Sequence, residues 1–130
     1  MNLKSLEKYK ITTVKTSDTV NQMLFVFDES IKLLYLAKKA LDEKDHDLKQ
    51  SILMKIVDIF MVLRSGVNTE AGEIIVMLDK FYEGTITKIH QVNISSKGSE
   101  DIDVVIDSIK QVRDSIQEAQ TNSAENKTPE

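Results

Sequence analysis

Few residues of this chain have a type and spacing that could do chemistry, and the two histidines are the clearest candidates. Glu43 and His46 have the Glu-x-x-His spacing of one half of a di-iron carboxylate site. That site requires a second copy of the motif and further inward-facing glutamates, and the rest of the sequence supplies neither. We therefore interpret His46 as a solvated residue of an inter-helix turn, and we expect no metal site.

His90 could act as a phosphorelay histidine, because such histidines lie on four-helix bundles. It lies near the end of a predicted helix, however, and the residues that follow it, Gln91, Val92 and Asn93, offer no basic or glycine neighbour. The sequence also has no Gly-rich phosphate loop, no nucleophile beside a base and no cysteine. We expect neither an enzyme nor a cofactor.

Composition and charge narrow the class of protein further. The 130 residues are enough for one domain with a substantial core. The formal net charge is -4 with both signs interspersed, which disfavours a nucleic-acid partner because nucleic-acid binders usually show a basic patch. The N-terminus has no apolar run of the signal-peptide type, and no apolar stretch approaches the ~20 residues that span a membrane. We expect a soluble cytoplasmic protein without a membrane partner.

Proline is nearly absent and glycine is sparse, which predicts a mostly helical chain. Apolar residues at three- and four-residue steps indicate four helices of roughly 20 residues, at about 18–43, 48–64, 70–92 and 100–119. Short connections make their neighbours antiparallel, so we predict an all-α, up-and-down four-helix bundle over residues 18–120. Asp18 is the expected N-cap of the first helix. Residues 1–17 are expected to form a capping segment, and residues 121–130 a disordered tail.

The first three predicted helices carry more apolar residues than one buried face requires. The core stripe of the second, for example, is expected to be Leu48, Ile52, Ile56, Ile59 and Leu63. The surplus indicates either a thick core that also packs the N-terminal segment, or an apolar groove for a partner segment. Helix-in-groove recognition favours adaptable Met and aromatic side chains. The candidate partner-binding residues of this kind are Met23, Phe25, Phe27, Tyr35, Met54, Met61, Met77 and Phe81.

An ordered series of short motifs resembles the flagellar secretion chaperones of the FliS family. The series begins with Tyr9-x4-Val14-x-Thr16-x-Asp18, where the family typically has Tyr-x4-Val-x-Thr-Ala-Ser-Pro. It continues through Phe27-Asp28, Glu43-Lys44-Asp45, Asp58-Ile59 and Leu63-Arg64, reaches Gly72-Glu73-Ile74, and closes at Val92-Asn93. The resemblance covers roughly residues 9–93. Departures include Glu29 where the family has glycine, and Ala71 in place of the first glycine of Gly-Gly-Glu-Ile.

The resemblance implies a cytoplasmic chaperone of the flagellar type III export system, without catalysis or cofactor. Such a protein binds the C-terminal segment of flagellin in apolar grooves, blocks premature polymerisation and delivers it to export gate components. The family's N-terminal tyrosine corresponds to Tyr9, so Tyr9 and Val14 join the candidate partner-binding residues. We expect residues 3–14 to form a movable lid over part of the groove.

Two other interpretations remain open from the sequence. One is a phosphorelay or metal-binding four-helix bundle, which phosphorylation or metal titration would reveal. The other is a bundle that uses its surplus apolar surface only to form a homodimer, which sedimentation would reveal.

Overall fold

The computed structural model describes residues 16–94 and 98–126 of the chain. Its elements are α2 (Thr16–Asp42), α3 (His46–Ser65), the short 3-10 helix η1 (Thr69–Ala71), α4 (Glu73–Ile94) and α5 (Glu100–Asn126). The prediction of an all-α four-helix bundle is confirmed. No described helix is long and apolar enough to cross a membrane.

The helix bounds differ from the expected ones for local reasons. Helix α2 begins at Thr16, so Asp18 lies inside its first turn and is not the N-cap. Helix α3 begins two residues earlier than expected because Asp45, assigned to the turn, is its N-cap. The Asp45 carboxylate accepts a hydrogen bond from the backbone N–H of Leu48 at 3.1 Å, which satisfies a free donor of the first turn.

Helix α5 is longer than the sequence pattern suggested. It continues to Asn126, so the expectation of a disordered tail is wrong for residues 121–126. Neither glycine nor proline interrupts the chain between Ser99 and Asn126, and the apolar stripe alone does not mark where such a helix ends. Residues 127–130 lie outside the described part of the chain.

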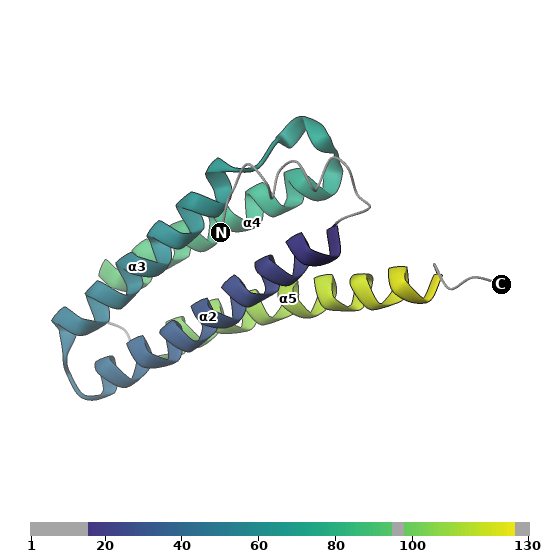
Figure 1. The fold of residues 1–130 in the computed structure, drawn as a ribbon. Helices are drawn as coiled ribbons and strands as arrows, with labels where there is room; N and C mark the ends of the chain where they lie inside the picture. The colour runs from purple at the N-terminus through teal and green to yellow at the C-terminus, as the bar shows by residue number, and fades with distance from the viewer. Residues whose placement is uncertain (1–15, 95–97, 127–130) are drawn as a thin grey trace.

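The four helices form two adjacent pairs. Figure 1 shows α2 beside α5 and α3 beside α4, with the pairs joined at one end by the turn after α2 and separating toward the other end. Helix α2 packs extensively against both α3 and α5, whereas α4 packs much more lightly against α5 than against α3. The seam between α4 and α5 is therefore packed more lightly than the α2–α3, α3–α4 and α2–α5 seams.

Aromatic side chains fill the centre of the core. Phe27 of α2, Phe60 of α3, and Phe81 and Tyr82 of α4 lie with ring centroids 5.8–6.4 Å apart, mostly edge to face. This range and geometry are those that aromatic pairs prefer. Phe27, Phe60 and Tyr82 are fully buried, so the cluster joins three of the four helices from within.

Ion pairs between side chains connect α2 to α5 and α3 to α4. Lys38 of α2 donates a hydrogen bond to Asp103 of α5 at 2.9 Å, which raises the pKa of the Lys38 ammonium. Arg113 of α5 donates to Asp28 of α2. Arg64 of α3 donates to Asp79 and Glu83 of α4. These partly exposed pairs fix helix orientation more than they add stability.

Candidate partner-binding groove

The side of α4 that faces α5 carries exposed apolar residues. Asp79 and Glu83 bond to Arg64, so they mark the flank of α4 that faces α3. At 100° per residue, Met77 and Phe81 lie on the opposite flank, and Ile74 lies there one turn earlier. Met77 is 68% exposed and Ile74 is 73% exposed, which is unusual for large apolar side chains on one helix face.

Helix α5 presents a matching apolar flank. Lys110 and Arg113 bond to side chains of α2 and mark the flank of α5 that faces α2. Val112 and Ile116 lie on the flank toward α4, and both are only half-buried although they pack against the core. They remain half-buried because the light α4–α5 contact does not cover them.

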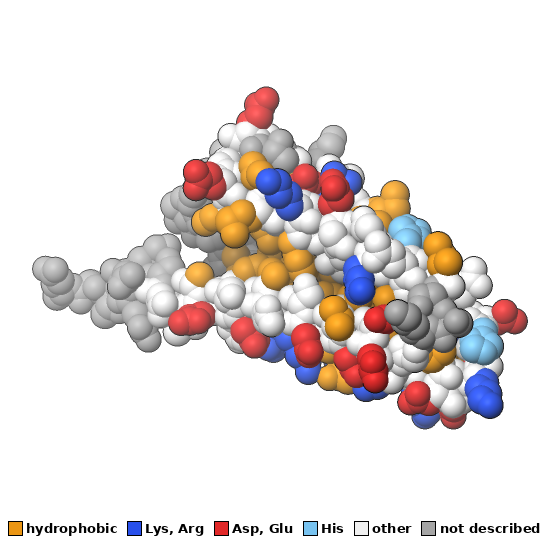
Figure 2. All heavy atoms as spheres, turned by 180° about the vertical axis from the view of Figure 1, so that it is seen from behind, with side chains coloured by type: hydrophobic (Ala, Val, Ile, Leu, Met, Phe, Trp, Pro, Cys, Tyr) orange, Lys and Arg blue, Asp and Glu red, His pale blue; other side chains and the backbone are white. Residues whose placement is uncertain are grey.

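Together these flanks form what we call the α4–α5 groove, defined by Met77 and Phe81 of α4 and by Val112 and Ile116 of α5. Figure 2 shows hydrophobic atoms gathered in a hollow between two ridges on this side of the molecule, with charged side chains along the ridges. Beneath the groove the core continues through α2, where Phe27 is fully buried. The groove can therefore take an apolar segment without burying a charge.

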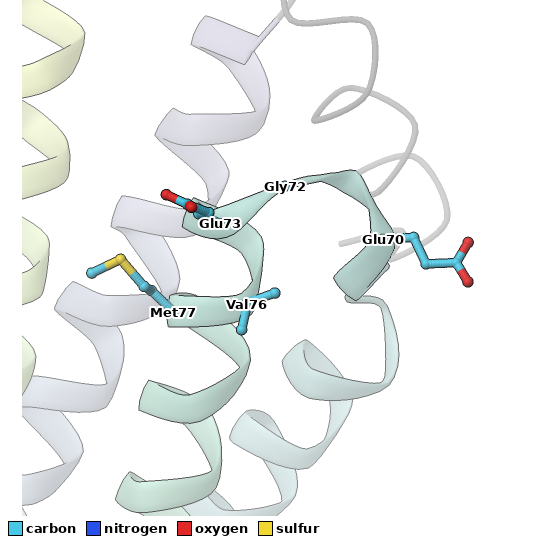
Figure 3. Close-up of a pocket in the computed structure, with 5 residues that line it drawn as sticks. All are labelled: Glu70, Gly72, Glu73, Val76 and Met77. Atoms are coloured by element: carbon cyan, nitrogen blue, oxygen red, sulfur yellow. The ribbon is translucent and has the colours of Figure 1, made fainter.

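A shallow pocket adjoins the groove at the start of α4. It is lined by Glu70, Gly72, Glu73, Val76 and Met77. Figure 3 shows Met77 and Glu73 extending from α4 on one side and Glu70 pointing the other way, so the two carboxylates do not converge. Gly72 has a φ of 136°, which other residues rarely adopt, and this lets the chain turn sharply between η1 and α4.

The structure separates the candidate residues named from the sequence. Met77 and Phe81 lie in the α4–α5 groove. Phe25 and Met61 are exposed, but on α2 and α3, away from these two. Tyr35 lies at the α2–α5 edge, where its hydroxyl accepts a hydrogen bond from the Lys110 ammonium at 2.9 Å.

The remaining candidates are less accessible or lie outside the described residues. Met23 and Phe27 belong to the buried core, and Met54 is half-buried against it. A partner would touch Met23 and Phe27 only if the core opened. Tyr9 and Val14 lie outside the described residues, so their proposed role stays a prediction.

Sequence reasoning missed the two groove residues of α5. Val112 and Ile116 belong to the cleanest amphipathic stripe of the chain, and this stripe indicated ordinary core positions. Both side chains are half-exposed because α4 and α5 pack lightly against each other. The spacing of apolar residues along one helix does not predict how closely a neighbouring helix packs against it. The one usable signal was the apolar surplus on the opposing helix, at Ile74 and Met77.

Both histidines are exposed, His46 at the first position of α3 and His90 one turn before the end of α4. Within residues 16–94 and 98–126, no three His, Cys, Asp or Glu side chains gather as metal ligands.

The described residues thus form an all-α bundle with exposed or half-buried apolar side chains along the α4–α5 groove. Residues 2–123 match the family model described as "Flagellar protein FliS", and the chain belongs to this family. The resemblance seen in the sequence is thereby confirmed, and a flagellar chaperone role follows at the family level. A search of curated proteins finds none that matches the chain.

Proposed function

We propose that this protein is a cytoplasmic export chaperone that binds the C-terminal segment of flagellin in the α4–α5 groove. Bound there, the segment is kept from premature polymerisation until the complex reaches export gate components. The observation that carries the proposal is the exposure of Met77 on α4, opposite half-buried Val112 and Ile116 of α5, in a chain of the FliS family.

The chemistry of the groove suits an amphipathic helix. Such a helix presents apolar residues at i, i+3, i+4 and i+7 along one face, and an apolar groove between two helices can bury that face. Methionine is unbranched and polarisable, so Met77 can adapt to the side chains of the guest. A flagellin segment that buries itself in the filament must have its apolar face covered beforehand, which is what the groove offers.

We also propose that residues 3–14 act as a lid that covers part of the groove until cargo arrives. The segment carries Leu6, Tyr9, Ile11 and Val14, few apolar groups for its length, so its docking is expected to be weak. A bare apolar surface invites self-association, and a weakly held self-segment would prevent this while remaining displaceable.

Calorimetric titration with a flagellin C-terminal peptide tests the proposed function. We expect a stoichiometry of about one to one and a negative heat-capacity change, since apolar surface is buried. We expect the affinity to persist at high salt, because apolar burial at ~25 cal/mol per Å² is little screened. Binding that disappears between low and high salt would count against an apolar groove as the site.

A further inference from the structure

Helix α4 has an exposed glycine, Gly84, near the middle of its 22 residues. Glycine is one of the least favourable residues for a helix interior, because it loses the most backbone freedom on folding. Its usual uses are to adopt a positive φ or to let another group approach the backbone closely. Gly84 has no positive φ, and a Cβ at this position would meet none of the described atoms within 4 Å. The use that remains is close approach by a group that the free protein lacks.

Gly84 lies on the α4 wall of the α4–α5 groove. It follows Met77 by two helical turns, so the two residues share one flank of the helix. The seam of this wall continues at steps of three and four through Met77, Phe81, Gly84 and Lys88, the spacing at which one helix packs against another. Gly84 therefore leaves a gap in a regular seam, directly beside Phe81.

The surroundings of the gap are mostly apolar. When two helices pack, a side chain of one enters a hole formed by four residues of the other, and at this level of α4 these are Phe81, Gly84, Thr85 and Lys88. Thr85 is buried, and its hydroxyl already donates to the backbone carbonyl of Phe81 at 2.8 Å. The aliphatic stem of Lys88 can line the hole while its ammonium stays in water. Because Gly84 contributes no side chain, the hole is wider than one formed by four side chains.

Helix α5 does not fill this gap. Helices α4 and α5 run in opposite directions (Figure 1), so the level beyond Phe81 on α4 corresponds to residues before Val112 on α5. The residue one turn before Val112 is Ser108, which is small and exposed. No described atom of α5 lies within 4 Å of a Cβ placed at Gly84. The gap is therefore open to a segment that lies in the groove.

We propose that the gap at Gly84 receives one large apolar side chain of the guest helix and thereby sets the register of that helix in the α4–α5 groove. This inference rests on the proposed binding of cargo in the groove. A leucine, methionine or phenylalanine suits a widened apolar hole, whereas a charged side chain would lose its hydration there. Met77 and Phe81 occupy the preceding levels of the wall, so the anchor fits at the Gly84 level. The groove then selects segments with a large apolar residue at the matching position.

Filling the gap tests the proposal, with calorimetric titration of a flagellin C-terminal peptide as the measurement. Gly84→Leu places a side chain where the anchor would lie, so affinity is expected to fall about tenfold or more, and Gly84→Ala should cause a smaller loss. Stability should change in the opposite direction. Leucine and alanine are both more favourable than glycine in a helix interior, so the urea midpoint of each variant is expected at or above that of the unchanged protein. Weaker binding by a protein that is no less stable separates a binding role from damage to the fold.

Shortening the guest then identifies the anchor. Each large apolar residue of the peptide is replaced by alanine in turn and titrated against both the unchanged protein and Gly84→Leu. One replacement is expected to weaken binding to the unchanged protein about tenfold or more. The same peptide should bind Gly84→Leu more tightly than the full peptide does, because the leucine then occupies the space of the missing anchor. Such a reversal is the sign of direct contact between two positions.

His90→Leu is the matched control. His90 is exposed and follows Glu83 by two turns, so it lies on the flank of α4 that faces α3, and a leucine there is expected to leave affinity unchanged. If the unchanged protein binds no peptide, the proposed function fails and this inference fails with it. If the unchanged protein binds but Gly84→Leu loses no more affinity than His90→Leu, or no shortened peptide recovers affinity for Gly84→Leu, the anchor site is wrong while the proposed function stands.

Discussion

At the residue scale, the hydroxyl of Tyr82 stands out. The side chain is fully buried among Phe27, Phe60 and Phe81, and among the described residues its oxygen has no hydrogen-bond partner. An unpartnered buried hydroxyl costs about 1–3 kcal/mol of desolvation. The nearby hydroxyl of Thr85, by contrast, donates to the backbone carbonyl of Phe81 at 2.8 Å.

Tyr82→Phe is therefore expected to raise the free energy of unfolding by about 1 kcal/mol, because it removes the unpartnered oxygen and keeps the ring. Urea denaturation of both proteins at neutral pH measures the change. Thr85→Val is the matched control: it also deletes a buried hydroxyl, but one that is bonded, and we expect no gain from it. Equal losses of stability in both variants would contradict the assignment.

The same variant should differ from the unchanged protein at alkaline pH. Burial raises the pKa of Tyr82 because the charged phenolate is disfavoured in the core. The unfolded state releases this proton near pH 10, whereas the folded state retains it. The stability of the unchanged protein should then fall above about pH 10 by up to ~1.4 kcal/mol per pH unit relative to Tyr82→Phe. Parallel slopes from pH 8 to 11 would contradict this.

His46→Ala and His90→Ala are expected to leave cargo affinity and solubility nearly unchanged. Both side chains are exposed, and exposed substitutions usually alter stability by less than about 0.5 kcal/mol. Peptide titration of each variant provides the measurement. A tenfold loss of affinity from either substitution would revive a chemical role for that histidine.

Single residues of α3 also show that the sequence did not predict which side chains would be buried. On α3, Leu48 was expected in the core but is 47% exposed, while Leu53 and Phe60, which lie outside the predicted core stripe, are fully buried. With apolar residues on several sides of a helix, periodicity leaves the direction of the core open. Packing against two neighbours decides it, as it does for Lys49, which is buried beside the same face.

At the element scale, the separation of the two helix pairs makes α4 and α5 the walls of the groove. Met77→Glu places a charge on one wall without touching the core, because Met77 is exposed in the free protein. We expect peptide affinity to fall tenfold or more while stability stays the same, since burying an unpaired carboxylate is costly. Calorimetric titration and urea denaturation measure the two quantities.

Val62→Glu is the matched control for this substitution, because Val62 is a similarly exposed apolar residue on α3. It lies outside the groove and is expected to leave affinity unchanged. Equal losses from Val62→Glu and Met77→Glu would place the site elsewhere or spread it over several faces.

Elements were the most predictable level of this structure. Sparse glycine and proline and a repeated three-to-four spacing are enough to predict four long helices. Their ends were less predictable. Asp45 caps α3 where a turn was expected, and Gly72 shortens α4 by redirecting the chain after η1. Asp45 is the cap because its carboxylate accepts a hydrogen bond from the Leu48 N–H. Several polar residues of the same turn could have made such a bond, so the sequence alone did not identify the cap.

At the scale of the whole molecule, ion pairs hold α2 to α5 and α3 to α4, whereas α4 and α5 pack lightly against each other. Arg113 and Lys38 tie α2 to α5, and Arg64 ties α3 to α4, so each pair is held internally. The groove lies along the lightly packed seam between α4 and α5, whereas α2 and α3 pack extensively against each other. A bundle built this way can expose apolar surface while its core stays closed, because the aromatic cluster joins α2, α3 and α4 beneath it.

Removing residues 1–14 tests whether the N-terminal segment serves the groove as a lid. A lid competes with cargo, so its docking free energy is subtracted from the apparent affinity. The deletion should then tighten peptide binding modestly or leave it unchanged, while the free protein becomes more prone to self-association. Sedimentation measures this self-association, and removal of residues 127–130 is the control truncation. If the deleted protein keeps its fold but no longer binds peptide, the segment is part of the binding surface and the lid hypothesis fails.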